Sequence, residues 1–116
     1  MNKLNFHHLR YFWAVAREGN LTRAAAQLHV SQSAVSVQIK KLEEALGQDL
    51  FDRSGRGLKL TQAGRVTLDY ADSIFHMGDE LVGVLEDQAN LVAQELRVGV
   101  LATLSRNFQI EFLGGL

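Results

Sequence analysis

Apolar residues at helical spacing predict two helices at the start of the chain. The repeating apolar positions are Phe6, Leu9, Phe12, Trp13 and Ala16. They form one face of an amphipathic helix over residues 5–18, which Gly19 can end in a left-handed conformation. Asn20 can then cap a second helix, "LTRAAAQL", by accepting a hydrogen bond from a backbone amide of its first turn.

A third helix follows a turn at His29 and Val30, and Ser31 is its natural cap. Its predicted core stripe recurs at positions i, i+4, i+7 and i+11: Val35, Ile39, Leu42 and Leu46. Gly47 ends this helix. The short turn between the second and third helices has the spacing of a helix-turn-helix.

The next segment predicts a β-hairpin and then a long helix. "DLFDR" and "LKLT" alternate apolar and polar residues around "SGRG", and Thr61 can cap a helix over residues 62–93. The apolar residues of that helix are spaced by three and four, as in a coiled-coil seam: Tyr70, Ala71, Ile74, Met77, Leu81, Val84, Leu85, Leu91 and Val92. Such a stripe needs a partner, so we expect pairing with a second copy of the chain, with packing inside the chain as the alternative. The residues expected at this interface are Tyr70, Ile74, Met77, Leu81, Val84 and Leu85.

After residue 93 the pattern changes again. "ELRVGVLATL" predicts a buried strand, and "SRNFQIEFLGGL" predicts the start of a helix. A strand followed by a helix opens an α/β domain. We therefore expect residues 94–116 to be the beginning of an incomplete α/β domain.

The distribution of charge adds a functional argument. Residues 1–66 carry ten Lys/Arg and five Asp/Glu, whereas residues 67–116 carry two Lys/Arg and eight Asp/Glu. The basic half suits an anionic partner, with chance segregation of charge as the alternative.

The chain has no cysteine, its four histidines lack metal-ligand spacing, and no catalytic triad is recognisable. We therefore expect no enzymatic activity, metal or cofactor, and a cytoplasmic protein without a membrane segment or signal peptide.

The outward face of the third helix carries the candidate chemistry. Ser33 and Val37 lie opposite the core stripe, and Gln32 and Ser36 lie on one flank, so the first two turns present small or uncharged side chains outward. A helix can enter the DNA major groove, where Gln and Ser bond base edges and an apolar group contacts the thymine methyl. A single exposed valine is also common without any function, and only the helix-turn-helix spacing decides between the two interpretations. Lys40 and Lys41 follow as expected phosphate contacts, with Glu44 one turn further along.

Other basic and hydroxyl side chains are expected around the helix-turn-helix. Arg53, Arg56 and Lys59 lie on or beside the glycine-flanked hairpin tip, where an arginine can enter a narrow, A·T-rich minor groove. A solvated turn is the alternative. The expected phosphate contacts are Thr22, Arg23, Lys40, Lys41, Arg53 and Thr61. Capping of a helix accounts equally for Thr61 and partly for Thr22.

These residues resemble a known family. The block "LTRAAAQLHVSQSAVSVQIKKLEEALG", followed by "LFDR" and "LTQAG", is similar to the winged helix-turn-helix of LysR-type transcriptional regulators over roughly residues 4–66. Within that family, "YFWAVAREG", "GRGL" and "YADSIF" most resemble regulators of sodium/proton antiporter genes. Val37 departs from the family pattern, because many members carry an arginine there.

The resemblance implies a mainly α fold with three parts: a winged helix-turn-helix at residues 1–61, a linker helix for dimerisation at 62–93, and the start of an effector-binding domain at 94–116. It implies a bacterial, nucleoid-associated regulator or activator, forming a homodimer or, at full length, a tetramer. Its partners would be double-stranded DNA and a small-molecule effector bound by the missing domain. By position, Gln32, Ser33, Ser36, Val37 and Arg56 would face bases. A protein-interaction module is the alternative, and its binding would depend little on salt.

Overall fold

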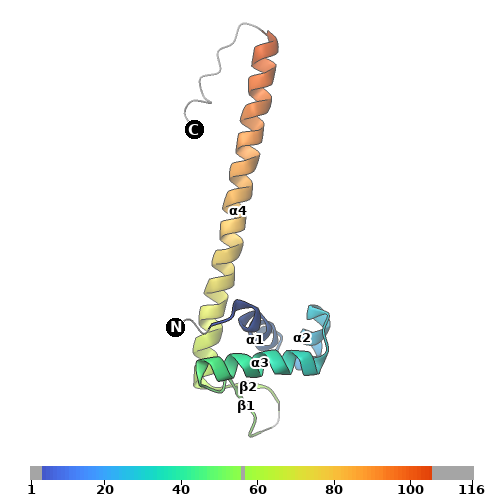
Figure 1. The fold of residues 1–116 in the computed structure, drawn as a ribbon, viewed down its shortest axis with the longest axis vertical. Helices are drawn as coiled ribbons and strands as arrows, with labels where there is room; N and C mark the ends of the chain where they lie inside the picture. Colours follow the sequence, from blue (N-terminus) through green and yellow to red (C-terminus); the bar gives the residue numbers. More distant parts are fainter. Residues whose placement is uncertain (1–3, 56, 106–116) are drawn as a thin grey trace. The chain divides into compact units, whose positions relative to one another are not determined.

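Four helices and one two-stranded hairpin form the described part of the computed structural model, which covers residues 4–55 and 57–105 (Figure 1). In chain order the elements are α1 (Phe6–Glu18), α2 (Leu21–Leu28), α3 (Gln32–Leu46), β1 (Phe51–Asp52), β2 (Lys59–Leu60) and α4 (Gln62–Ser105). The contacts divide the chain into two units, Met1–Phe75 and His76–Leu116, and α4 contributes to both. The mainly α fold with a helix-turn-helix, a small strand pair and a long helix is confirmed.

The helix ends lie where the sequence predicted them. The side chain of Asn20 accepts a hydrogen bond from the amide of Arg23 at 2.8 Å, and Ser31 Oγ accepts one from the amide of Ala34 at 3.1 Å. Gly19 ends α1 with φ of 69°, and Gly47 ends α3 with φ of 73°. These positive values are costly for residues with a Cβ, so the two glycines are the natural stop signals.

The first unit has one hydrophobic core. Its buried members come from α1, α2, α3, β1 and α4 and from the residue before β1: Leu9, Phe12, Val15, Ala24, Ala25, Val35, Ile39, Leu42, Leu50, Phe51 and Ala71. The alanines of α2 keep that helix thin, and the rings of Phe12 and Phe51 lie 5.3 Å apart between centroids. This core holds one face of α3 inward, which leaves the opposite face for solvent.

The hairpin pairs β1 with β2 in antiparallel register, with Phe51 opposite Leu60. Phe51 is buried and Leu60 is partly buried, whereas Asp52 and Lys59 on the other face of the hairpin are exposed. Asp52 accepts hydrogen bonds from the hydroxyl and the amide of Ser54, at 2.6 and 2.9 Å, and these bonds lower the pKa of Asp52. The predicted hairpin is therefore confirmed, with a loop that begins in a tight local turn.

The start of α4 packs tightly against the strand region. Thr61 caps the helix by accepting a hydrogen bond from the amide of Gly64, while its amide donates to the carbonyl of Leu50 at 3.0 Å. Gly64 is buried, and a Cβ at that position would run into the same Leu50 carbonyl oxygen. A glycine is therefore needed here for close approach rather than for an unusual backbone conformation.

Further along, an aromatic and charged cluster fixes α4 to α1. Asp72 accepts hydrogen bonds from Trp13 Nε1 at 2.7 Å and from the Arg17 guanidinium at 2.9 Å. The rings of Trp13 and Phe75 lie 4.7 Å apart, and Arg10 lies 4.6 Å from the centre of the Phe75 ring. The bond from Trp13 is the main cause, and Arg17 a lesser one, of an Asp72 pKa below its ordinary value of 3.8, although desolvation acts in the other direction.

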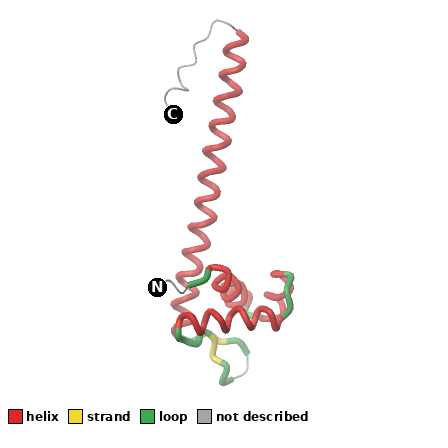
Figure 2. The backbone as a smooth tube through the Cα atoms, in the orientation of Figure 1, coloured by secondary structure: helices red, strands yellow, loops and turns green. Residues whose placement is uncertain are grey.

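The helix continues beyond its predicted end, and the strand predicted at residues 95–104 is wrong. Residues 94–105 belong to α4 (Figure 2). Apolar side chains expected in a buried strand are exposed here, among them Leu96, Val98 and Val100. A strand needs neighbouring strands for its backbone hydrogen bonds, and β1 and β2 are the only strands among the described residues. A helix satisfies the same groups locally. The helix predicted after residue 105 lies outside the described residues.

Candidate nucleic-acid interface

The first two turns of α3 present the expected ridge of small and uncharged side chains. Gln32, Ser33 and Ser36 are exposed, and Val37 is 50% exposed. Three members of the predicted core stripe, Val35, Ile39 and Leu42, are no more than 3% exposed, whereas Leu46, the last residue of α3, is 38% exposed, so its prediction as a core residue is wrong. Because the core takes one face, the opposite face is available over its length. At the start of the ridge, the Ser33 hydroxyl lies 3.2 Å from the hydroxyl of the capping serine.

Exposed cations flank this ridge. Lys40 and Lys41 lie one turn further along α3 and are exposed, as are Thr22 and Arg23 at the start of α2. A shallow surface hollow is lined by the side chains of Ser36, Val37, Lys40, Lys41 and Glu44. The arrangement therefore combines an uncharged centre with basic margins, as a helix that meets both bases and phosphates requires.

Glu43 is the residue of this region that the sequence pattern did not reveal. Its carboxylate is 6% exposed and accepts hydrogen bonds from the amides of Leu50 and Phe51, at 2.7 and 3.3 Å. The guanidinium of Arg53 adds contacts at 3.1 and 3.2 Å. Glu43 thus connects the end of α3 to the beginning of the hairpin. The available signal was its place beside Leu42, next to the apolar stripe, where a charged side chain needs a partner.

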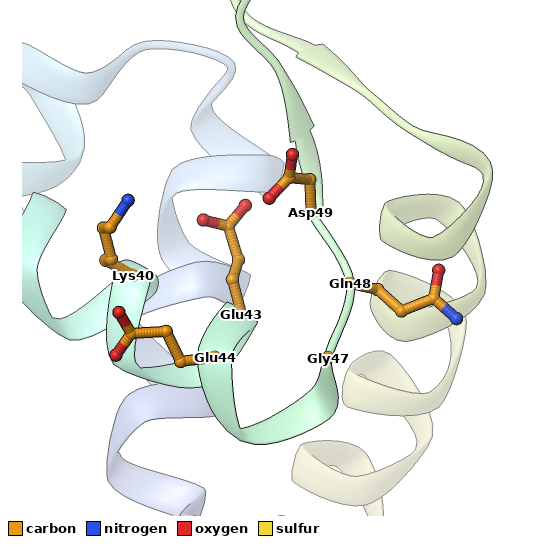
Figure 3. Close-up of a pocket in the computed structure, with 6 residues that line it drawn as sticks. All are labelled: Lys40, Glu43, Glu44, Gly47, Gln48 and Asp49. Atoms are coloured by element: carbon orange, nitrogen blue, oxygen red, sulfur yellow. The ribbon is translucent and has the colours of Figure 1, made fainter.

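The cleft around Glu43 is lined by Lys40, Glu43, Glu44, Gly47, Gln48 and Asp49 (Figure 3). In the close-up, Glu43 points inward toward the chain that leads into β1, whereas Gln48 points away from it. The anchored carboxylate therefore organises the turn between α3 and β1. Three carboxylates line this cleft, so the cleft is a poor place for phosphate.

Two predicted phosphate contacts already have protein partners. Arg53 pairs with Glu43, but its side chain is 56% exposed, and a guanidinium has five N–H donors, so donors remain for a phosphate. The Thr61 hydroxyl donates its only proton to the carbonyl of Asp49 at 2.6 Å. Since phosphate oxygens only accept hydrogen bonds, this hydroxyl has no proton left for them. Lys59 is exposed, and Arg56 lies outside the described residues.

The described residues contain no cluster of three or more His, Asp or Glu side chains that could hold a metal ion. Nor does any helix within the described ranges have the length and apolar character needed to cross a membrane.

Comparison with known proteins identifies the family. The model described as "Bacterial regulatory helix-turn-helix protein, lysR family" matches residues 6–65, which include α1, α2, α3 and the hairpin. The chain belongs to the LysR family.

Two relatives and one solved structure illustrate the range of similarity. The chain is 40% identical to a RuBisCO operon transcriptional regulator of Allochromatium vinosum over 102 residues, 88% of this chain and 34% of the relative. It is 36% identical to the transcriptional activator protein NhaR of Escherichia coli over 108 residues, 91% of this chain and 35% of the relative. The crystal structure of the BenM DBD in complex with catB site 1 DNA superposes with a TM-score of 0.71, at 37% identity over 75% of this chain and 94% of the other.

These comparisons confirm the family resemblance but do not single out the antiporter-gene subgroup, because a RuBisCO operon regulator is similar to a comparable degree. Both relatives are transcriptional regulators rather than enzymes. The LysR-family chain spans about a third of the length of these curated relatives.

The seam residues predicted on α4 lie in different environments. Tyr70 is 68% exposed, whereas Ile74 is partly buried against the core of the first unit and Ala71 is fully buried. In the second unit, exposed apolar side chains continue along the helix at Met77, Leu81, Val84 and Leu85, each more than half exposed. The first unit therefore uses part of the predicted stripe for its own packing.

Proposed function

We propose that this LysR-family chain is the DNA-binding part of a transcriptional regulator, with α3 in the major groove. The observation that carries the proposal is the outward face of α3, where Gln32, Ser33, Ser36 and Val37 are exposed above a fully packed core. The major groove admits a helix, and donors of this kind read base edges. The similarity to the BenM DBD, whose structure was solved in complex with DNA, supports a DNA-binding role for this chain.

In this proposal the surrounding cations fix the register of the helix on the duplex. Arg23, Lys40, Lys41 and Arg53 contact phosphates, and the hydroxyl of Thr22 adds a neutral donor. The hairpin is the wing, and Arg56 reaches into the adjacent minor groove. The Glu43 anchor supports the wing, because it holds Arg53 and the residues before it in place against α3.

We further propose that two copies pair through α4. The exposed apolar side chains from Met77 to Leu85 would be costly in water if they remained uncovered along a helix of this length. Pairing with the same surface of a second copy covers them symmetrically. It also places two recognition helices on one DNA molecule, as the half-sites of an operator require.

The test is duplex binding at two salt concentrations. Two copies bring roughly eight phosphate-contacting cations, so affinity should fall about 10⁴-fold between 50 and 200 mM salt as counterions are released. Fluorescence anisotropy with a labelled duplex recovered by random-site selection measures this directly. No detectable binding to duplex DNA of any sequence at low salt would overturn the proposal. Weak salt dependence would instead favour a protein-interaction module.

We propose two alternatives for the regulated genes: activation of sodium/proton antiporter genes, and control of another metabolic operon. Similarity to NhaR and to a RuBisCO operon regulator supports transcriptional regulation in general. Mapping the chromosomal sites bound by the full-length protein distinguishes the two, because the first requires occupancy upstream of antiporter genes.

A further inference from the structure

The hollow on the outward face of α3 has an unusual lining for a DNA-facing surface. Most of its surface is apolar, although four of its five side chains are polar: Ser36, Lys40, Lys41 and Glu44 line it together with Val37. Long lysine side chains can lay their alkyl stems along a surface while the ammonium groups remain in water. The two methyl groups of Val37 and these stems are therefore the carbon surface of the hollow.

This chemistry disfavours a phosphate or a polar base edge as the occupant. Val37 has neither donor nor acceptor, so it cannot bond a guanine or adenine edge. A phosphate would bind the ammonium groups at the margin, and the Glu44 carboxylate would repel it from the hollow. The apolar group that the major groove offers is the C5-methyl of thymine. The basic margins suit the duplex that carries such a methyl group, since the phosphates lie to either side of the bases.

We propose that the hollow lined by Val37 and the lysine stems is a methyl-reading subsite, which selects a 5-methylpyrimidine over the unmethylated base at one position of each half-site. This proposal rests on the proposed placement of α3 in the major groove. Burial of one methyl group between Val37 and the lysine stems gives about a fourfold preference in affinity. Thymine and 5-methylcytosine present the same methyl group at the same ring position, so the subsite recognises both.

The experiment uses base analogues in the duplex recovered by random-site selection. Each thymine is replaced singly by deoxyuridine, and affinity is measured by fluorescence anisotropy. The affinity of the wild-type protein should fall about fourfold when deoxyuridine replaces one particular thymine of each half-site. When a C·G pair is placed at that position, the affinity of the protein should rise by a similar factor if the cytosine carries a 5-methyl group. A methyl effect for thymine alone would overturn the claim that the methyl group itself is read.

Variants assign the effect to Val37. Val37→Ala should bring the thymine-to-deoxyuridine ratio close to one at that position, while Val37→Ile should preserve the ratio. Val66→Ala is the matched control, because Val66 is a similarly exposed helical valine on α4, at 46%. The ratio is internal to each protein, so a general loss of affinity or stability does not change it.

Two results would overturn the subsite while leaving the proposed function intact: no thymine at which the methyl group matters, or a ratio that survives Val37→Ala. Failure of the wild-type protein to bind any duplex would remove both the subsite and the proposed function.

Discussion

The Glu43 anchor provides the sharpest test of how α3 and the hairpin are joined. Replacing Glu43 with alanine removes an acceptor that serves the amides of Leu50 and Phe51 and the guanidinium of Arg53. Leu50 and Phe51 are no more than 4% exposed, so water has little access to replace the lost bonds. We expect Glu43→Ala to lower the free energy of unfolding substantially, because the two amides belong to residues of the hydrophobic core.

The magnitude follows from the separate contacts. A buried amide left without an acceptor costs about 1–3 kcal/mol, and the 3.3 Å bond from Phe51 is the weaker of the two. The Arg53 side chain is 56% exposed, so its ion pair contributes about 1 kcal/mol or less after solvent screening. The sum for Glu43→Ala is therefore about 2–5 kcal/mol.

Two matched variants separate the contributions. Glu43→Gln keeps one side-chain oxygen for the two amides but removes the charge and the second acceptor oxygen that pairs with Arg53, so it should cost about 1 kcal/mol. Arg53→Ala removes only the exposed ion pair and should cost less than about 1 kcal/mol. Urea unfolding followed by circular dichroism, at neutral pH and one protein concentration, gives all three values.

The order of the three costs is decisive. Equal losses for Glu43→Gln and Glu43→Ala would mean that the charge, rather than the pair of amide bonds, supports the turn. An Arg53→Ala cost as large as that of Glu43→Ala would assign the effect to the ion pair. A Glu43→Ala protein as stable as the wild type would refute the anchor altogether.

Three further variants test the packing of α4. Gly64→Ala should lower the free energy of unfolding by about 1–3 kcal/mol or more, because its Cβ meets the backbone carbonyl of Leu50. Asp72→Asn should destabilise at neutral pH by removing the charge that accepts from Trp13, and its difference from the wild type should shrink in urea titrations below about pH 4. Leu81→Asp should yield monomers in sedimentation experiments, and these should bind DNA weakly because they engage single half-sites.

The controls for these variants lie on the same helix. A Cβ at Gly78 meets open space, so Gly78→Ala should stabilise by about 0.5–1 kcal/mol where Gly64→Ala destabilises. For Asp72, the folded-state pKa is depressed, so its stabilisation is present above the unfolded value and is lost as the pH falls through the folded value. An Asp72→Asn difference that grows in acid would contradict this direction. A Leu81→Asp protein that stays dimeric would place the pairing surface elsewhere.

Local chemistry made the first three helices predictable. Asn20 and Ser31 cap α2 and α3 through bonds to amides three residues away. Gly19 and Gly47 end α1 and α3 at positive φ, which glycine adopts without strain, whereas α2 ends at His29 with φ of 59°. The exposed face of α3 could also be predicted from the sequence. Once periodicity assigns one face to the core, the opposite face follows from helix geometry.

The segment after residue 93 shows where a local pattern was insufficient. Its run of β-branched and leucine residues satisfies the pattern of a buried strand, yet the structure continues α4 through it. A short apolar run does not distinguish strand from helix, because the strand depends on partners that are distant in the sequence. Of the predicted seam, Ile74 and Ala71 pack against the first unit, which the spacing alone did not reveal.

Sequence by itself determined the short-range features of this LysR-family chain: the caps and ends of α1 to α3, the hairpin, and an outward face of small side chains on α3 with cations around it. Only the tertiary structure revealed the contacts of Glu43 with the hairpin, of Gly64 with the Leu50 carbonyl, and of Asp72 with Trp13. The physical reason is range. A cap or a helical stripe depends on residues close together in the sequence, whereas each of these three contacts joins residues that come close only when the chain folds.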